Sequence, residues 1–350
     1  MDGGTQEARD SGAARRPRRR ASMADVAAMA GVSSQTVSRV ANNRSNVEEE
    51  TRRRVLSAMR VLGYRPNTAA RALVTGQFRT LGLISFGFSN FGNARTADAI
   101  ARVAQRSGYT VNMVAIESQT ERAVHQAFDQ LTMQAVDGIV LVEAQILDTP
   151  ALRLPPGVPV VMAQGDLNLR HPMVDTDQAL GARLVTRHLL DLGHRTVWHV
   201  SGPEDSYSAR GRAESWHATL KEAGATVPPV LFGDWSAASG YEAGLRLAER
   251  PEVTAVFAAN DQMALGVMRA MTQAGRRIPD DVSLAGFDDI EESAYLSPPL
   301  TTVHQDFDVV AERIVSLMLT QIETGEIPST IALVAPRLVV RESTGAPPSR

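Results

Sequence analysis

The spacing of hydrophobic residues divides the chain into a helical first part and a longer part in which strands and helices alternate. Between residues 22 and 62, apolar side chains recur every three or four positions, which predicts short amphipathic helices. Beyond residue 80, runs of four to six apolar residues alternate with amphipathic segments. The clearest runs are 138–142, 158–162, 196–200 and 255–258. This alternation is typical of parallel sheets flanked by helices, and the units suffice for two such lobes.

Capping and turn residues in the first part predict a helix-turn-helix. Ser22 and Asp25 form a capping pair at the start of a first helix, and Gly31 ends that helix in a tight turn. A second helix is predicted over 34–40 and a third over about 48–62. Two short helices that a glycine turn joins form a common DNA-binding unit.

Amino-acid composition distinguishes the segments that flank these two regions. The first 21 residues are rich in Gly, Ala and Arg and lack apolar periodicity, which predicts disorder. This basic arm either adds affinity for phosphate or is a solvated tail without a specific role. The predicted order is a disordered basic arm at 1–21, a helical unit at 22–65, a linker segment at 66–77, a core at 78–341, and a disordered tail without a leucine heptad at 342–350.

Charge is distributed unevenly along the chain. The formal net charge is -3, yet residues 1–76 hold 14 Arg against 7 acidic residues, a net of +7. The remainder carries a net of -10. A basic head on an acidic body indicates a polyanion, such as nucleic acid, as the partner of the head.

Several classes of function are excluded by residues that the chain lacks. It has no cysteine, which excludes disulfides, thiolate zinc sites and cysteine nucleophiles and fits a reducing compartment. It contains no His-Glu-x-x-His, Gly-x-Ser-x-Gly or Gly-x-Gly-x-x-Gly motif. No apolar run approaches the roughly 18–20 residues that span a bilayer, and no secretory signal follows the N-terminal arginines. We therefore expect a cytoplasmic, non-enzymatic protein that uses no cofactor or metal.

The chain resembles the LacI/GalR family of transcriptional regulators from residue 23 to about residue 341. In the helical unit the matching stretches are Asp25-Val26-Ala27, Ala30-Gly31-Val32-Ser33, Thr36-Val37-Ser38-Arg39-Val40, Thr51-Arg52-Arg53-Arg54-Val55 and Gly63-Tyr64-Arg65-Pro66-Asn67. In the core they are Ala259-Asn260-Asp261-Gln262-Met263-Ala264-Leu265-Gly266, Pro298-Pro299-Leu300-Thr301-Thr302 and Gln305-Asp306-Phe307. The segment Gly233-Asp234-Trp235-Ser236 narrows the resemblance to the lac branch of the family.

The resemblance implies a fold in two parts. An all-α helix-turn-helix head is expected to precede an α/β two-lobed core like that of periplasmic binding proteins, with parallel sheets flanked by helices. The expected N-lobe is 78–176 with 307–334, and the expected C-lobe is 177–304 with 335–341. Residues 66–77 would hold a hinge helix and linker, and the core would bind the effector and form the dimer.

Two groups of residues are candidates for DNA contact. The second predicted helix projects four polar side chains outward, namely Ser34, Gln35, Ser38 and Arg39. Gln pairs with adenine and Arg with guanine in the major groove, although a solvated helix face is the alternative for any one of them. The resemblance also implies a hinge helix in the minor groove, with Asn67, Ala70 and Leu73 as its contacts. Leu73 would be wedged into a base step instead of a protein core.

The resemblance implies an effector site between the lobes. Its expected residues are Phe86, Arg212, Trp235, Asn260, Asp288 and Gln305. Trp235 would pack on the sugar ring, although a tryptophan after a strand is often a core residue. A pair such as Asp288-Asp289 is often a turn. Gln164 and Val142 stand approximately where the lac branch has an aspartate and an asparagine, so the sequence does not identify the sugar.

These observations predict a dimeric repressor that binds a pseudo-palindromic double-stranded operator and a small sugar. A galactoside-like inducer is favoured, and a coiled-coil tetramer is not expected. The alternatives are a sugar phosphate or purine that acts as a corepressor, or a role as an activator. An exported sugar-binding protein shares the expected core, but the helix-turn-helix argues against it.

Overall fold

The computed structural model describes residues 21–41, 46–65, 76–87, 90–116, 120–142, 154–165, 172–327 and 330–349. It divides into a first compact unit that ends at Gln77 and a second that begins at Phe78. The predicted basic arm lies outside the described residues except for Ala21, and so do Asn67, Ala70 and Leu73 of the predicted hinge. None of the described helices is long and apolar enough to cross a membrane.

In its described residues, the first unit is a head of three helices. It contains α1 (Met23–Ala30), α2 (Ser34–Ala41) and α3 (Glu49–Leu62). Ser22 and Asp25 form a reciprocal capping box on α1, and Gly31 ends α1 in the left-handed conformation at φ 64°. Each helix contributes one fully buried valine to a common core, namely Val26, Val37 and Val55. The predicted helix-turn-helix is therefore confirmed.

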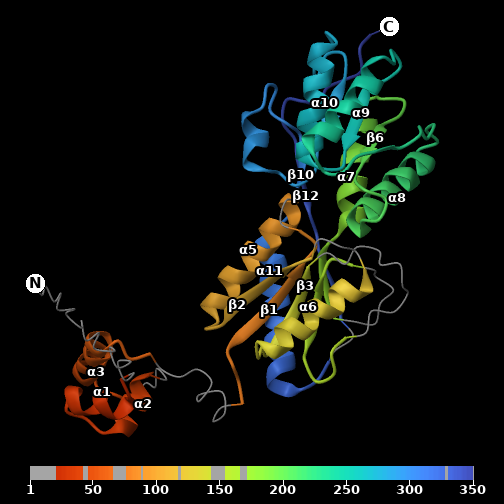
Figure 1. Ribbon diagram of the computed structural model, residues 1–350. Coiled ribbons are helices and arrows are strands. Elements are labelled where there is room, and N and C mark those ends of the chain that lie inside the picture. Colours follow the sequence, from red (N-terminus) through yellow and green to blue (C-terminus); the bar gives the residue numbers. More distant parts are fainter. Residues whose placement is uncertain are drawn as a thin grey trace, which may run out of the picture. The chain divides into compact units, whose positions relative to one another are not determined.

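The N-lobe of the second unit contains a parallel six-stranded sheet in the order β11-β5-β4-β3-β1-β2. Figure 1 shows three of these strands, β3, β1 and β2, next to one another. Its strands are β1 (Thr80–Ser85), β2 (Thr110–Ala115), β3 (Gly138–Val142), β4 (Val160–Ala163), β5 (Met173–Thr176) and β11 (Ile331–Val334). Its helices are α5 (Phe91–Arg106), α6 (Glu121–Met133) and α11 (Phe307–Thr324). Leu81 and Leu83 pack toward α5 and α11, whereas Ile84 packs toward α6. Neighbouring side chains of a strand point to opposite faces, so both faces of this sheet are covered.

The C-lobe repeats this design around a parallel four-stranded sheet in the order β7-β6-β8-β9. Its strands are β6 (Trp198–Ser201), β7 (Leu231–Phe232), β8 (Ala255–Ala258) and β9 (Ser283–Ala285). Its helices are α7 (Gln178–Asp191), α8 (Tyr207–Glu222), α9 (Ala237–Ala248), α10 (Asp261–Gln273) and the 3-10 helix η1 (Glu291–Tyr295). Helices α9 and α10 pack closely because Gly240 and Gly266 face backbone atoms where a Cβ would not fit.

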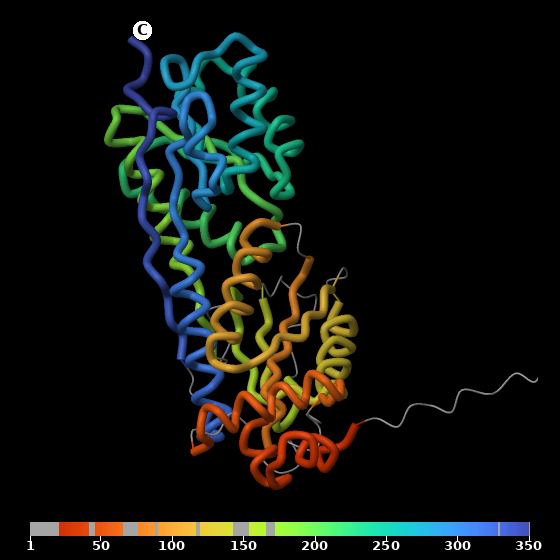
Figure 2. Tube along the Cα trace, turned by 90° about the vertical axis from the view of Figure 1, so that its left-hand side faces the viewer, coloured from red at the N-terminus to blue at the C-terminus, as the bar shows by residue number. Residues whose placement is uncertain are grey.

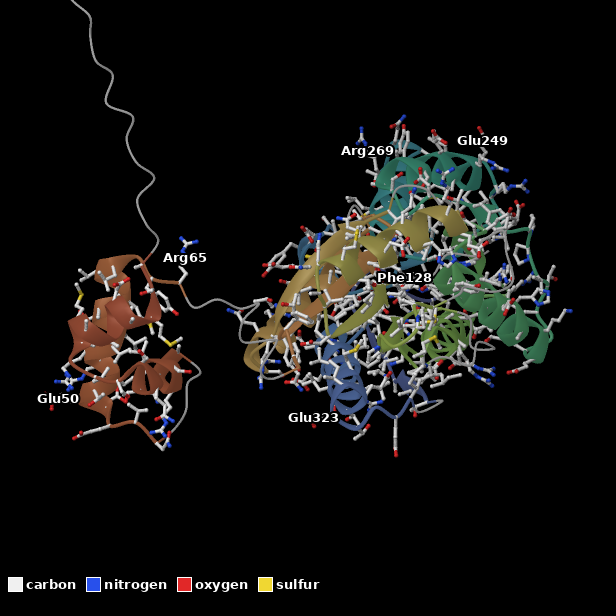
Figure 3. The ribbon with its side chains drawn as sticks, turned by 60° about the horizontal axis from the view of Figure 1, so that its bottom comes forward. Glu50, Arg65, Phe128, Glu249, Arg269 and Glu323 are labelled. Carbon is white, nitrogen blue, oxygen red and sulfur yellow. The ribbon has the colours of Figure 1, made fainter. Side chains whose placement is uncertain are left out.

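The side chains labelled in Figure 3 show how both units separate apolar from charged residues. Phe128 lies inside the N-lobe and is 2% exposed, whereas Glu249 and Arg269 extend from the C-lobe into solvent. On the head, Glu50 and Arg65 are likewise exposed. Exposed charge around a closed apolar core is the pattern expected of a folded domain in water.

The part of the chain that the structure describes passes between the two lobes three times. It crosses at Asp177, between β5 and α7; at Gln305 and Asp306, between β10 (Thr302–His304) and α11; and at residues 335–336, between β11 and β12 (Arg337–Val339). Strands β10 and β12 pair antiparallel, so the second and third crossings run side by side (Figure 2). The lobes are thus joined by three short connections, an arrangement that suits hinge motion.

The prediction of a disordered tail at 342–350 is wrong for residues 342–349. This segment lies along the edge strand β9, where Leu284 N donates to Ser343 O (2.8 Å) and Gly345 N donates to Ser283 Oγ (2.9 Å). Ser343 is fully buried. The segment is held by hydrogen bonds to an open sheet edge, so it needs little hydrophobicity and carries no apolar pattern.

Candidate functional site

Helix α2 presents the candidate base-reading residues of the head. Ser33 Oγ accepts from Thr36 N (3.1 Å) at its start, and Val37 and Val40 turn the opposite face of α2 into the core. Ser34, Gln35 and Arg39 are exposed, and Ser38 is half-buried. Three of the four predicted side chains therefore point away from the core, as a helix that enters the major groove requires.

The second unit contains a small polar cavity between the lobes. Five of the six predicted effector residues line it, namely Arg212, Trp235, Asn260, Asp288 and Gln305. Asn90, Gly92, Asn93 and Gln164 of the N-lobe and Ser208 of α8 complete the lining among the described residues. The structure does not bring Phe86 into this set. Its side chain packs against the core on the α6 side of the N-lobe sheet, and its carbonyl accepts from Asn93 Nδ2 (3.3 Å).

Two of the residues that line this cavity, Arg212 and Asp288, form a buried ion pair. Arg212 is 4% exposed and Asp288 is 6% exposed, with 3.8 Å between Arg212 Nη1 and Asp288 Oδ1. Gln305 Nε2 donates to Asp288 Oδ1 (2.7 Å). Burial raises the pKa of Asp288 to about 6, although Arg212 and Gln305 both act to lower it. The guanidinium carbon of Arg212 lies 3.7 Å from the centre of the Phe287 ring.

Trp235 is held in place by Gly202 and Asn260. A Cβ at Gly202 would lie 2.5 Å from the Trp235 ring, so only glycine permits this contact. Asn260 Nδ2 donates to Trp235 O (3.0 Å) and to Gln262 Oε1 (2.9 Å), while its Oδ1 accepts from Met263 N (2.9 Å) at the start of α10. Asn260 therefore caps a helix and fixes the tryptophan, a role that the sequence did not indicate.

Backbone strain gathers around the same cavity. Six described residues other than glycine have a positive φ, and three of them line the cavity. These are Gln164 at 70°, Trp235 at 73° and Asp288 at 116°. Left-handed backbone is unfavourable for L-residues and persists where the surroundings impose it, which happens most often at functional sites. This clustering independently marks the cavity as the candidate site.

Four lining residues were missed by sequence reasoning, namely Asn90, Gly92, Asn93 and Ser208. Asn90 Oδ1 caps α5 by accepting from Gly92 N (2.8 Å), and Asn93 is 1% exposed. Asn90 and Asn93 follow β1 at its carboxyl end, where parallel sheets carry their ligand sites. That position was the available signal, because an asparagine that caps a helix is otherwise an ordinary structural residue.

The side chains described above nearly fill the cleft. The cavity measures about 20 Å³, against roughly 300–1,000 Å³ for small-molecule sites in general. A ligand of ordinary size therefore enters only if the two lobes, or the side chains between them, move apart.

The fold and the cavity together define a class of protein. The chain carries a helix-turn-helix head and a two-lobed core with a buried polar cleft. This domain organisation is typical of a ligand-responsive DNA-binding regulator. A family model described as bacterial regulatory proteins, lacI family, matches residues 22–67. A second, described as a periplasmic binding protein-like domain, matches residues 186–344.

Relatives with known roles extend this match over nearly the whole chain. The lactose operon repressor of Escherichia coli K12 is 36% identical over 337 residues, which cover 92% of this chain and 90% of the relative. The ribose operon repressor of the same strain is 32% identical over 333 residues, which cover 92% of this chain and 99% of the relative. A crystal structure of the lac repressor dimer bound to operator and the anti-inducer ONPF is 32% identical, covers 94% of this chain and 100% of that one, and has a TM-score of 0.81.

The chain belongs to the lacI family of bacterial regulatory proteins. It is a DNA-binding transcriptional repressor and not an enzyme. The predicted family, fold and repressor function are thereby confirmed.

Proposed function

We propose that this repressor binds a small neutral sugar in the cleft and that the sugar lowers its affinity for operator DNA. The observation that carries the proposal is the buried Arg212–Asp288 pair with Gln305 beside it. A sugar hydroxyl both donates and accepts hydrogen bonds. The carboxylate accepts, the guanidinium donates, and the amide does both.

The charge of the lining favours a neutral ligand over a sugar phosphate. Arg212 is the one lysine or arginine among the described lining residues, and Asp288 compensates its charge. The N-lobe side contributes the neutral amides of Asn90, Asn93 and Gln164. A phosphate carries a charge of up to -2 and is usually bound by additional cations. The cleft therefore suits hydroxyl groups better.

Among sugars, we favour a galactoside-like inducer. The segment Gly233–Ser236 resembles the lac branch, and it places Trp235 beside the buried pair, 5.5 Å from the guanidinium carbon of Arg212 to the ring centre. A lac repressor bound to ONPG in the repressed state is similar to this chain, at 33% identity and a TM-score of 0.83. The transcriptional regulator CelR in complex with cellobiose also aligns, at 29% identity and a TM-score of 0.70.

For the head, we propose that a homodimer reads a pseudo-palindromic operator. Ser34, Gln35, Ser38 and Arg39 would contact bases, since α2 exposes Ser34, Gln35 and Arg39 and leaves Ser38 half-buried beside them. Asn67, Ala70 and Leu73 would enter the minor groove, as the resemblance of the segment around Pro66-Asn67 suggests. The relative that is bound to operator is a dimer, which supports the same assembly here.

A thermal-shift screen tests the ligand class. Purified repressor is heated with monosaccharides, disaccharides, sugar phosphates and purines, since a ligand that binds the folded state raises the melting temperature. We expect a galactoside to raise it in the wild type and in R210M, but not in R212M. Arg210 is the matched control because it lies on the same helix and is exposed.

Two results would correct the proposal. A shift with phosphates or purines alone would replace the neutral sugar with a charged or aromatic effector. An R212M variant that responds like R210M would move the binding site away from the cleft.

A further inference from the structure

Gln178 lies behind the cavity and is not among the residues that line it. It is the first residue of α7, directly after the first crossing between the lobes, and it is 7% exposed. Its amide connects residues that the proposed function uses with residues that join the lobes. No family motif quoted above includes it.

Three hydrogen bonds hold the Gln178 amide, and both hydrogens of Nε2 are used. Its Oε1 accepts from Arg212 Nε (2.8 Å). Its Nε2 donates to Asp175 Oδ1 (3.3 Å) and to Gln305 Oε1 (3.4 Å). Because Gln305 donates in turn to Asp288, which faces Arg212, the four side chains close a ring. Every member of the ring is at most 7% exposed.

The hydrogen bonds of Gln178 span the hinge between the lobes. Asp175 belongs to β5 of the N-lobe, Gln305 lies in the second crossing, and Arg212 projects from α8 of the C-lobe. When one lobe turns against the other, Gln178 cannot hold all three partners at their present distances, because its amide is short and rigid. The lobe positions and the orientation of Arg212 are therefore coupled through this side chain.

We infer that Gln178 is a positioning residue that couples the effector-contacting Arg212 to the lobe crossings, and so couples effector binding to operator affinity. The inference rests on the proposed function in that an effector acts at Arg212. An effector changes operator affinity only through interactions that differ between the two lobe arrangements. The bonds of Gln178 are such interactions, and no ligand contact by Gln178 itself is required.

The first test compares Q178L with Q321L. Gln321 is the matched control because it is a buried glutamine in α11 whose amide has no hydrogen-bond partner among the described residues. Operator affinity is measured with and without the effector that the thermal-shift screen identifies. Allosteric effectors typically change affinity by about 5- to 150-fold. We expect that factor in wild type and Q321L, and a factor close to one in Q178L with its effector-free operator affinity retained.

A second test needs no effector and therefore separates this inference from the choice of ligand. Coupling is reciprocal, so operator binding must alter the core. An operator duplex is selected from random DNA with the purified repressor, and amide hydrogen exchange is followed in the peptide that contains Arg212. We expect the operator to change this exchange in wild type and Q321L but not in Q178L. Two results overturn the inference: an unchanged response in Q178L, or no response in the wild type.

Discussion

Replacing Ser343 with alanine tests whether the C-terminal segment stabilises the C-lobe. Ser343 Oγ donates to Leu284 O (2.6 Å) and accepts from Thr301 N (2.8 Å), and the residue is fully buried. Alanine removes both bonds and leaves a buried carbonyl and a buried N–H without these partners. No methyl group is lost from the core, so the change isolates the hydrogen bonds.

The expected loss follows from the penalty for unpaired buried polar groups. Leaving such a group unsatisfied costs about 1–3 kcal/mol. For a domain of this size, each kcal/mol lowers the melting temperature by about 2–4 °C. Because two groups lose a partner, the loss is about 2–6 kcal/mol, and we expect S343A to melt on the order of 10 °C below the wild type.

Differential scanning calorimetry with S349A as the control measures this change. Ser349 lies in the same segment but is exposed, so its replacement leaves the melting temperature unchanged. The head serves as an internal reference because it shares no residues with the C-lobe. An S343A core that melts within 1 °C of S349A would refute the reasoning and show that the segment only rests on the sheet edge.

Four further predictions concern the core and the head. In G202A, the added Cβ displaces the Trp235 ring. We expect titration calorimetry to show that the variant binds sugar at least about tenfold more weakly, a loss of about 1.4 kcal/mol of binding free energy. Unchanged affinity would mean that Trp235 does not contact the sugar. Because burial raises the pKa of Asp288 to about 6, its carboxylate form is lost below that pH, so sugar affinity should rise between pH 5 and 7 in wild type and not in D288N. Burial and the charge of Asp288 raise the pKa of Asp261 to about 7, so the folded core holds a proton that the unfolded chain has released. Urea unfolding should then show wild-type stability falling relative to D261N as pH rises from about 4 to 7, and a constant difference would contradict the buried, protonated Asp261. Finally, R39A should weaken binding to a selected operator by about 1–3 kcal/mol and reduce the preference of the repressor for one base over the others at one position. Gel-shift titration of operator variants measures both effects. Equal weakening on every sequence would mean that Arg39 contacts a phosphate instead of a base.

Local signals predicted the head well because its structure is set by neighbours in the chain. Ser22 and Asp25 are three residues apart and cap each other, and Gly31 supplies the left-handed turn within its own helix end. Such interactions are complete within one or two helical turns, so the sequence displays them directly.

The cleft was predicted in part because its residues follow strand ends. Arg212, Asp288 and Gln305 are where the βαβ pattern and the family resemblance place them. Gln178 was missed because its partners lie 3, 34 and 127 residues away, and nothing in its own segment marks it. The ordered C-terminal segment was missed for the same physical reason, since its hydrogen bonds reach Thr301 and Leu284.

The three crossings also determine the order in which the repressor can fold during synthesis. The last strand of the N-lobe sheet, β11, pairs with β5, which is made more than 150 residues earlier. The apolar core of the head is formed by residues between Met23 and Tyr64. At typical rates of synthesis of about 5–20 residues per second, the ribosome completes α3 on the order of 10–50 s before it makes β11. Each new chain thus passes through an interval in which a folded head is present before the cleft that would regulate it exists.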